Sequence, residues 1–186
     1  MDNRSVFKHE RGFILGKYKV FEYYNTNKTK SIDVMTSTET QFRDVAVYST
    51  IGLSKTELGL TSQGLSVRVE LIGVGDKDDD TVANIISTVG FDIMDTKNCG
   101  YGMTVTDVIR QYNDTLEVRH VVLLEPVFWE YYTPLERDGE HVSWLLCVPI
   151  TDNELRFIRE KGIDEFETLL SEQSGDITDI HRKSFV

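Results

Sequence analysis

The sequence predicts an α+β fold in which a mixed, mostly antiparallel sheet packs against helices. Two observations predict it. Several strand patterns precede one strong helix pattern, and a buried strand near residue 145 leads directly into two amphipathic helices. Because strands and helices do not alternate regularly, a doubly wound parallel sheet is not expected. With 186 residues and 40% hydrophobic residues, the chain is expected to form one domain over residues 1–186.

The first part of the chain predicts one short helix followed by three strands. The helix is expected within residues 5–15, where apolar side chains recur among polar ones. Runs rich in aromatic and β-branched residues then mark strands at 17–24, 31–35 and 45–51. The polar stretch between the first two strands is expected to be a turn.

The middle of the chain predicts strands at 65–72 and 119–124 on either side of a helix. Apolar residues at helical spacing run from Val82 to Val89. The glycine pairs of 73–75 and 100–102 lack the third glycine of a dinucleotide loop and are predicted to form turns that need positive φ. Residues 106–115 fit either a helix or a loop.

The stretch from His141 to Leu170 carries the strongest fold signal. An apolar run predicts a strand covered on both faces, which should end at Pro149 because proline cannot donate to a neighbouring strand. Thr151 and Glu154 stand at capping-box spacing for a following helix, and Gly162 separates it from a second helix.

The chain is acidic, with a net charge of −11, and the charge is unevenly spread. Residues 1–30 contain three acidic and seven basic residues, whereas the remainder contains 28 acidic and 13 basic ones. Direct nucleic-acid binding is therefore not expected, because phosphate contacts need clustered Lys and Arg. An acidic surface attracts basic partners, although solubility alone also explains such a charge.

No apolar stretch approaches membrane-spanning length, and the first residues lack the apolar centre of a secretory signal. The expectation is a cytoplasmic protein without membrane contact, either a monomer or a weak dimer. The two cysteines, Cys99 and Cys147, have no metal-site spacing, and Cys147 is expected to be inert in the core.

The acidic run Asp76, Asp78, Asp79 and Asp80 resembles a calcium loop only superficially. Its sixth position is Thr81 rather than glycine, and its twelfth is a serine rather than a bidentate glutamate. A solvated helix start explains the run most simply, and contact with a basic partner is the functional alternative.

No catalytic, cofactor or metal constellation is evident. The four histidines are scattered, although His120 and His141 both enter predicted strands and could converge. Glu125 and Glu130 could form a carboxylate pair, but carboxylates are common in so acidic a chain. The aromatic cluster Phe128, Trp129, Tyr131 and Tyr132 fits a core edge or a protein-interaction patch.

Five short blocks follow one another in a distinctive order. They are YSTIGLS at 48–54, RVEL at 68–71, HVVLLEP at 120–126, VSWLL with VPIT and EL at 142–155, and DIHRKS at 179–184. In this order they resemble the suppressor-of-fused-like domain family over about residues 45–186, while residues 1–44 fit the family less well.

The resemblance implies an α+β sandwich that works as a binding module, with no catalytic residues to carry over. Small bacterial members are similar to immunity proteins, antitoxins that block a cognate polymorphic toxin, often a nuclease of the LXG type. The eukaryotic relative has a second domain and binds a transcription factor.

The leading hypothesis is therefore an immunity protein without enzymatic activity that occludes the active site or substrate groove of a basic nuclease toxin. Complementary charge would speed its association. Two alternatives stay open: a peptide-binding adaptor, and a hydrolase using Glu125, Glu130 or His120. The candidate toxin contacts are acidic and aromatic: Asp76, Asp78, Asp79, Asp80, Glu130, Tyr131 and Tyr132.

Overall fold

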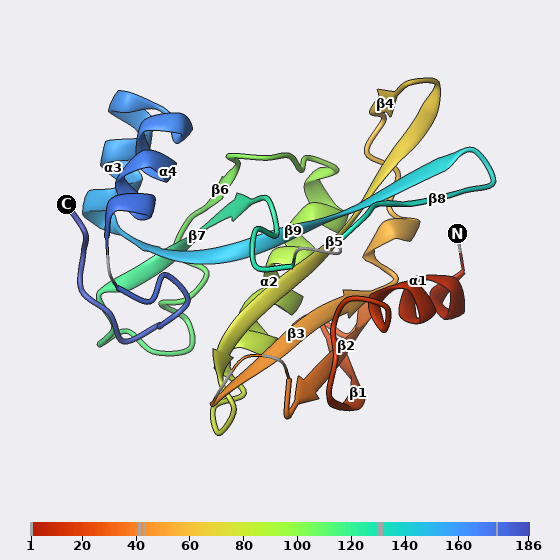
Figure 1. The fold of residues 1–186 in the computed structure, drawn as a ribbon, viewed down its shortest axis with the longest axis horizontal. Coiled ribbons are helices and arrows are strands. Elements are labelled where there is room, and N and C mark those ends of the chain that lie inside the picture. The colour runs from red at the N-terminus through yellow and green to blue at the C-terminus, as the bar shows by residue number, and fades with distance from the viewer. Residues whose placement is uncertain (1, 41, 43, 130–131, 174) are drawn as a thin grey trace.

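The computed structural model describes residues 2–40, 42, 44–129, 132–173 and 175–186. Its fold is a nine-stranded mixed sheet with four α-helices (Figure 1), so the predicted α+β class is confirmed. The helices are α1 (Asn3–Glu10), α2 (Thr81–Thr96), α3 (Asp152–Lys161) and α4 (Ile163–Glu172), with a short 3-10 helix at Leu53–Lys55.

Seven strands form the continuous path of the sheet in the order β1-β2-β3-β5-β9-β7-β6, with β4 beside β5 and β8 beside β9. All pairs are antiparallel except β5 with β9, which is parallel and lies near the centre. The strands are β1 (Lys17–Tyr24), β2 (Ser31–Thr38), β3 (Val45–Ile51), β4 (Thr61–Ser62), β5 (Leu65–Asp76), β6 (Thr104–Val105), β7 (Val118–Leu124), β8 (Leu135–Arg137) and β9 (Glu140–Thr151).

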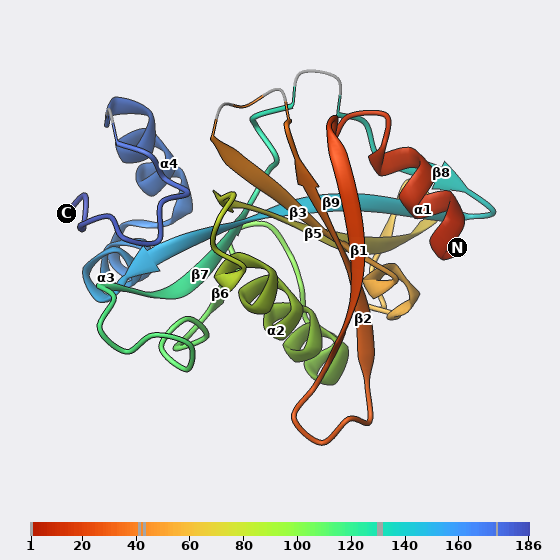
Figure 2. The ribbon, with the colours of Figure 1, turned by 90° about the horizontal axis from the view of Figure 1, so that it is seen from below.

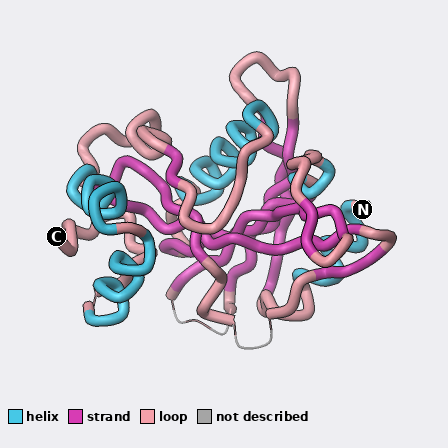
Figure 3. The backbone as a smooth tube through the Cα atoms, turned by 90° about the horizontal axis from the view of Figure 1, so that it is seen from above, coloured by secondary structure: helices cyan, strands magenta, loops and turns pink. Residues whose placement is uncertain are grey.

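Each face of the sheet carries its own hydrophobic core. Alternate residues of β3 show this, because Ala46 and Tyr48 join the cluster that packs under α2, whereas Val47 and Ile51 join the one under α1 and α3. Figure 2 shows α2 crossing one side of the strands, and Figure 3 shows α3 and α4 packed together at one end of them.

The predicted start of α3 is confirmed in detail. The Thr151 hydroxyl accepts from the Glu154 N–H, and the Glu154 carboxylate accepts from the Thr151 N–H, which makes the capping box. Gly162 then separates α3 from α4 at a φ of +94°.

The prediction that β9 ends at Pro149 is wrong, because the strand continues to Thr151. Beyond Leu146 the strand has lost β5 as a neighbour and keeps only β7. The carbonyl of Pro149 accepts from Arg182 at 2.6 Å, on the side away from β7. The missing N–H therefore faces no strand, and the proline costs no strand hydrogen bond.

The prediction of a turn at 73–75 is also wrong, because Gly73 and Gly75 lie inside β5. Their role is to admit a helix: a Cβ at Gly75 would lie 2.5 Å from a methyl of Val82, and one at Gly73 would lie 2.6 Å from another. The glycines let the first turn of α2 rest directly on the strand. In the second glycine pair, Gly102 does take positive φ, +76°, as predicted.

Candidate protein-binding groove

The acidic run lies in the connection between β5 and α2, where it borders an open groove of about 520 Å³. The register places Val45 beside Asp76, so the residues that precede β3 also reach this place. The C-terminal segment (dark blue in Figure 1) supplies the opposite wall with residues 176–181. Six aspartates from three parts of the chain line the groove: Asp44, Asp76, Asp78, Asp79, Asp176 and Asp179.

Most of these carboxylates are held by turns of their own backbone. The N–H groups two residues further on donate to the carboxylates of Asp76, Asp79, Asp176 and Asp179, each at 2.8 Å. Such local hydrogen bonds orient the carboxylates without neutralising their charge. One described cation lies beside the groove: Lys77 pairs with Asp44 at 3.1 Å.

The acidic loop affects the pKa of Tyr48, which lies beneath it. The Tyr48 hydroxyl donates to the backbone carbonyls of Asp79 and Asp76, at 3.0 and 3.4 Å. Burial raises the pKa of Tyr48, and the negative charges of Asp80 and Asp79 raise it further. The loop therefore places several negative charges close to the buried Tyr48 side chain.

A small apolar pocket of about 150 Å³ adjoins the acidic groove. Val45, Asp176 and Thr178 line both hollows, so the two are continuous. The pocket adds Phe42, Val74 and Phe128, and the rings of Phe42 and Phe128 pack edge to face at 6.3 Å. An apolar hollow beside fixed charges is typical of a surface that binds protein, because it can take an anchoring side chain while the rim pairs charges.

The structure brings together some of the predicted contacts and separates others. Asp76, Asp78 and Asp79 line the groove, whereas Asp80 caps α2 next to it without a side-chain hydrogen bond to the helix. Glu130 and Tyr131 lie outside the described residues.

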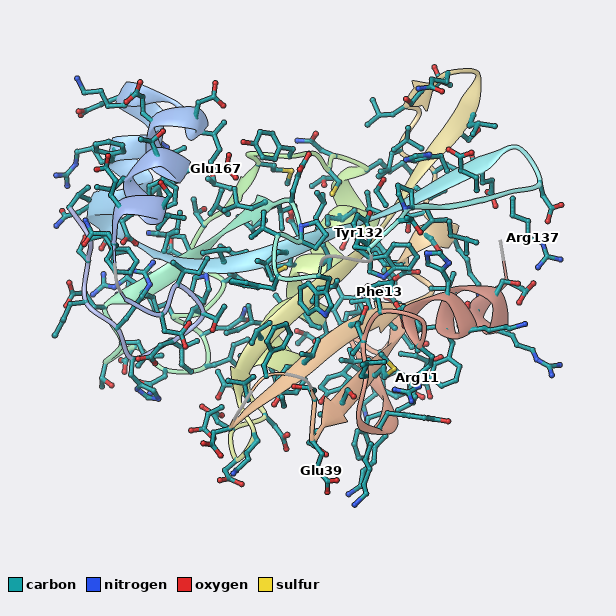
Figure 4. The ribbon with its side chains drawn as sticks, viewed as in Figure 1. Arg11, Phe13, Glu39, Tyr132, Arg137 and Glu167 are labelled. Carbon is teal, nitrogen blue, oxygen red and sulfur yellow. The ribbon has the colours of Figure 1, made fainter. Side chains whose placement is uncertain are left out.

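Tyr132 belongs to a different part of the molecule. Its hydroxyl accepts from the backbone N–H of Trp144 at 2.9 Å, and its ring packs against the Trp144 ring. It also packs against Phe13, which is labelled beside it in Figure 4. It lines another cavity, with Tyr101 and Trp144, that shares no described residue with the acidic groove. The grouping of Tyr132 with the acidic run is therefore not what the structure shows.

Sequence reasoning missed half of the groove. Asp44, Asp176 and Asp179 are far from the acidic run in the chain, and only the tertiary fold brings them to it. A local signal was nevertheless present, because Asp-x-Thr at 176–178 is the pattern of a turn that orients a carboxylate.

The two histidines considered for a metal or catalytic site, His120 and His141, do not come together. Nδ1 of His120 accepts from the Asp107 N–H at 2.9 Å, so Nε2 carries the proton and donates to Asp152, also at 2.9 Å. His141 lies at the opposite end of β9, beside Glu136 and Ser143, so the two histidines do not converge. Within the described part of the chain, no three side chains are placed to hold a metal ion.

Helices of the described ranges are all too short or too polar to cross a membrane.

Comparison with known proteins gives one consistent result. The family model described as suppressor of fused protein (SUFU) matches residues 28–183. "Immunity protein YqcF" of Bacillus subtilis (strain 168) is 30% identical to this chain over 187 residues, covering 100% of this chain and 97% of that protein.

Solved structures show the same fold. A SUFU homologue from Neisseria gonorrhoeae FA 1090 superposes with a TM-score of 0.75 at 20% identity, over 99% of this chain and 96% of that one. A chain of the Sufu–Fu complex gives 0.62 at 11% identity, over 98% of this chain and 90% of its own. Drosophila Suppressor of Fused superposes with a TM-score of 0.60 at 13% identity, over 90% of this chain but only 42% of the Drosophila chain.

Proposed function

This chain belongs to the suppressor-of-fused family, and from that premise we propose that it is an immunity protein that binds and neutralises a cognate toxin. The observation that carries the proposal is the match to the Bacillus immunity protein, which runs the length of both chains. The same family includes a chain crystallised in a complex with another protein, which agrees with a binding role.

The proposed toxin is a basic nuclease domain, of the LXG type that the family resemblance implies. Its substrate groove would have to be lined by Lys and Arg in order to hold phosphates. The six aspartates of the acidic groove offer carboxylates to such a surface, and the adjoining apolar pocket offers a place for one anchoring side chain. Binding there would block nucleic acid by occupying its electrostatic site.

The proposal is tested by co-expression in a bacterium with basic toxin domains, scored first by growth and then by co-purification. Rescue of growth together with a stable stoichiometric complex is the expected result. Rescue without a complex would contradict neutralisation by binding and would point to enzymatic inactivation of the toxin. Failure to rescue any cognate toxin would favour the adaptor alternative.

A further inference from the structure

Strand β1 forms one end of the sheet and is unusually exposed for an edge strand. All of its residues are exposed except Tyr23, which is half-buried. Its large apolar side chains include Tyr18 at 47%, Val20 at 43%, Phe21 at 51% and Tyr24 at 53% exposure. In Figure 2, β1 lies in front of the sheet, and α1 contacts the start of the strand, where Phe7 packs against the Tyr18 ring at 5.1 Å.

The free edge of β1 presents a regular row of backbone groups. The Asn25 N–H donates to the Lys30 carbonyl at 3.1 Å, which marks this as a hydrogen-bonded pair of the β1–β2 hairpin. Antiparallel pairs alternate between hydrogen-bonded and non-hydrogen-bonded ones. The odd-numbered residues of β1 therefore bond to β2, while the N–H and C=O groups of Tyr18, Val20, Glu22 and Tyr24 point outward.

This edge has few of the devices that usually prevent pairing. It contains no proline, and its register with β2 runs unbroken through eight residue pairs, without a bulge. Lys17 and Lys19 are the two positive charges on it. Long, regular, apolar edge strands are ready templates for another strand.

We propose that this edge pairs with β1 of a second copy of the chain, in antiparallel orientation, with Val20 opposite Val20 at the twofold axis. The two sheets then form one continuous sheet. Because the axis is perpendicular to the sheet, the two copies present the same faces, and even-numbered residues meet even-numbered ones as their outward backbone groups require.

The side chains are self-complementary in this register. Glu22 of one copy lies opposite Tyr18 of the other, and the guanidinium of Arg11, labelled in Figure 4, stands 4.4 Å above the Tyr18 ring. On the other face Lys19 lies opposite Phe21, which suits a cation–π contact. A register centred on Phe21 would bring the two Glu22 carboxylates into diagonal contact, just as the proposed register brings the two Lys19 ammonium groups into diagonal contact. The register centred on Val20 is favoured because only it places Glu22 opposite the Tyr18 ring that carries the Arg11 guanidinium.

Pairing along one edge buries less surface than a standard interface, so the dimer is expected to be weak, forming at concentrations of about 10–100 µM. Its contacts are mainly backbone and apolar, and each chain carries a net charge of −11. Added salt should therefore leave the dimer unchanged or strengthen it, because screening reduces the repulsion between the two chains.

The register is tested by oxidative cross-linking of the full chain, because Cys99 and Cys147 are both buried. Val20→Cys should cross-link to itself, since hydrogen-bonded antiparallel partners lie about 5.5 Å apart, within disulfide range. Tyr24→Cys is the matched control on the same face of the same strand. Residue 24 would lie opposite residue 16 of the other copy, so the two introduced cysteines would be about 27 Å apart. The yield of cross-linked dimer should therefore be more than about tenfold lower than for Val20→Cys.

A second variant tests the hydrogen bonds. Val20→Pro removes an outward N–H that does not bond to β2, so the hairpin should persist while sedimentation equilibrium shifts from a dimer toward the monomer of 21.3 kDa. Equal cross-linking at positions 20 and 24, or wild-type protein that stays monomeric with no cross-link at 20, would overturn the proposal. Binding of an acidic extended peptide to a monomeric chain would also overturn it and assign the edge to another strand.

Discussion

Two sets of carboxylates in this molecule are used in opposite ways. Glu10, Glu70 and Glu154 are fully buried, whereas the aspartates of the acidic groove stand at its surface. Both oxygens of Glu70 and of Glu154 accept hydrogen bonds within the fold, whereas Glu10 accepts its hydrogen bonds through Oε1. In the groove, Asp76, Asp79, Asp176 and Asp179 each accept a hydrogen bond from their own turn, and Asp44 pairs with Lys77.

Glu70 and Glu154 show how the buried set works. Glu70 accepts from the Thr50 hydroxyl and from the N–H groups of residues 52–54, which ties β5 to the 3-10 helix. Glu154 forms a two-pronged ion pair with Arg182 at 2.7 and 2.9 Å and joins the C-terminal segment to α3. These partners fall in the sequence blocks at 48–54, 68–71, 142–155 and 179–184.

This comparison explains what the sequence could predict. The patterns of apolar residues predicted the fold class correctly, and the spacing of Thr151 and Glu154 predicted the α3 capping box. The family blocks coincide with the residues that make the buried hydrogen bonds. They contain little of the groove, because Asp44, Asp76 and Asp176 lie outside them. Under the proposed function, residues that contact a partner would differ between relatives that bind different partners, so blocks shared by the family would not include them.

Two other predictions were wrong because they considered only residues that are neighbours in the sequence. The local sequence predicts that strands end at Pro149 and before Gly75. At Pro149, however, β9 pairs with β7 alone, so no strand hydrogen bond is lost. At Gly75, β5 continues because the missing side chain leaves room for Val82 of α2. Glu10 was not singled out either. It accepts from Ser49 of β3 and Trp144 of β9, which no local pattern reveals.

The largest effect on stability is expected from the buried set. Glu70→Ala removes the acceptor of three backbone N–H groups, two of them buried, and should lower the free energy of unfolding by about 3–5 kcal/mol. Urea unfolding measures it, with Glu57→Ala, an exposed glutamate, as the control. A loss below about 1 kcal/mol would show that the buried carboxylate is not holding the fold.

The second-largest effect is expected in the pH dependence of stability, to which the buried Glu10 should contribute. Burial, then the charge of Glu70, raises the pKa of Glu10 well above 4.5, so the folded state holds a proton that the unfolded state releases. This contribution is complete below pH 4.5 and is lost as the pH rises through the raised pKa. Glu10→Gln, which cannot ionise, should unfold at a higher temperature than wild type at pH 8 and show a flatter profile from pH 5 to 8.

If Glu10→Gln and wild type lose stability in parallel as the pH rises, the Glu10 carboxyl is not the source of the pH dependence.

Charge reversal in the groove should affect stability much less. Neither Asp78 nor Asp80 caps a turn with its side chain in the described contacts, so Asp78→Lys with Asp80→Lys should change the free energy of unfolding by no more than about 1 kcal/mol. Relief of repulsion among the aspartates opposes the loss of favourable charge at the start of α2. Thermal unfolding of the variant and of wild type measures this change. A loss of several kcal/mol would show that the acidic loop, like the buried glutamates, stabilises the fold.

The smallest effect should come from Asp80→Asn alone. It removes one charge near the N-terminus of α2 and should cost about 0.3–1 kcal/mol, less at high salt. Unfolding in low and high salt measures it, and a cost that does not change with salt would argue against a charge–dipole effect.

The most direct measurement is the association rate with a basic cognate toxin domain in low and high salt. Asp78→Lys with Asp80→Lys is compared with Asp114→Lys with Glu160→Lys, which makes the same change in net charge away from the groove. Recognition by the acidic groove predicts that the groove variant associates more than about tenfold more slowly in low salt, that the control stays near wild type, and that high salt narrows the difference. Equal association of the two variants in low salt would contradict the groove as the toxin-binding surface.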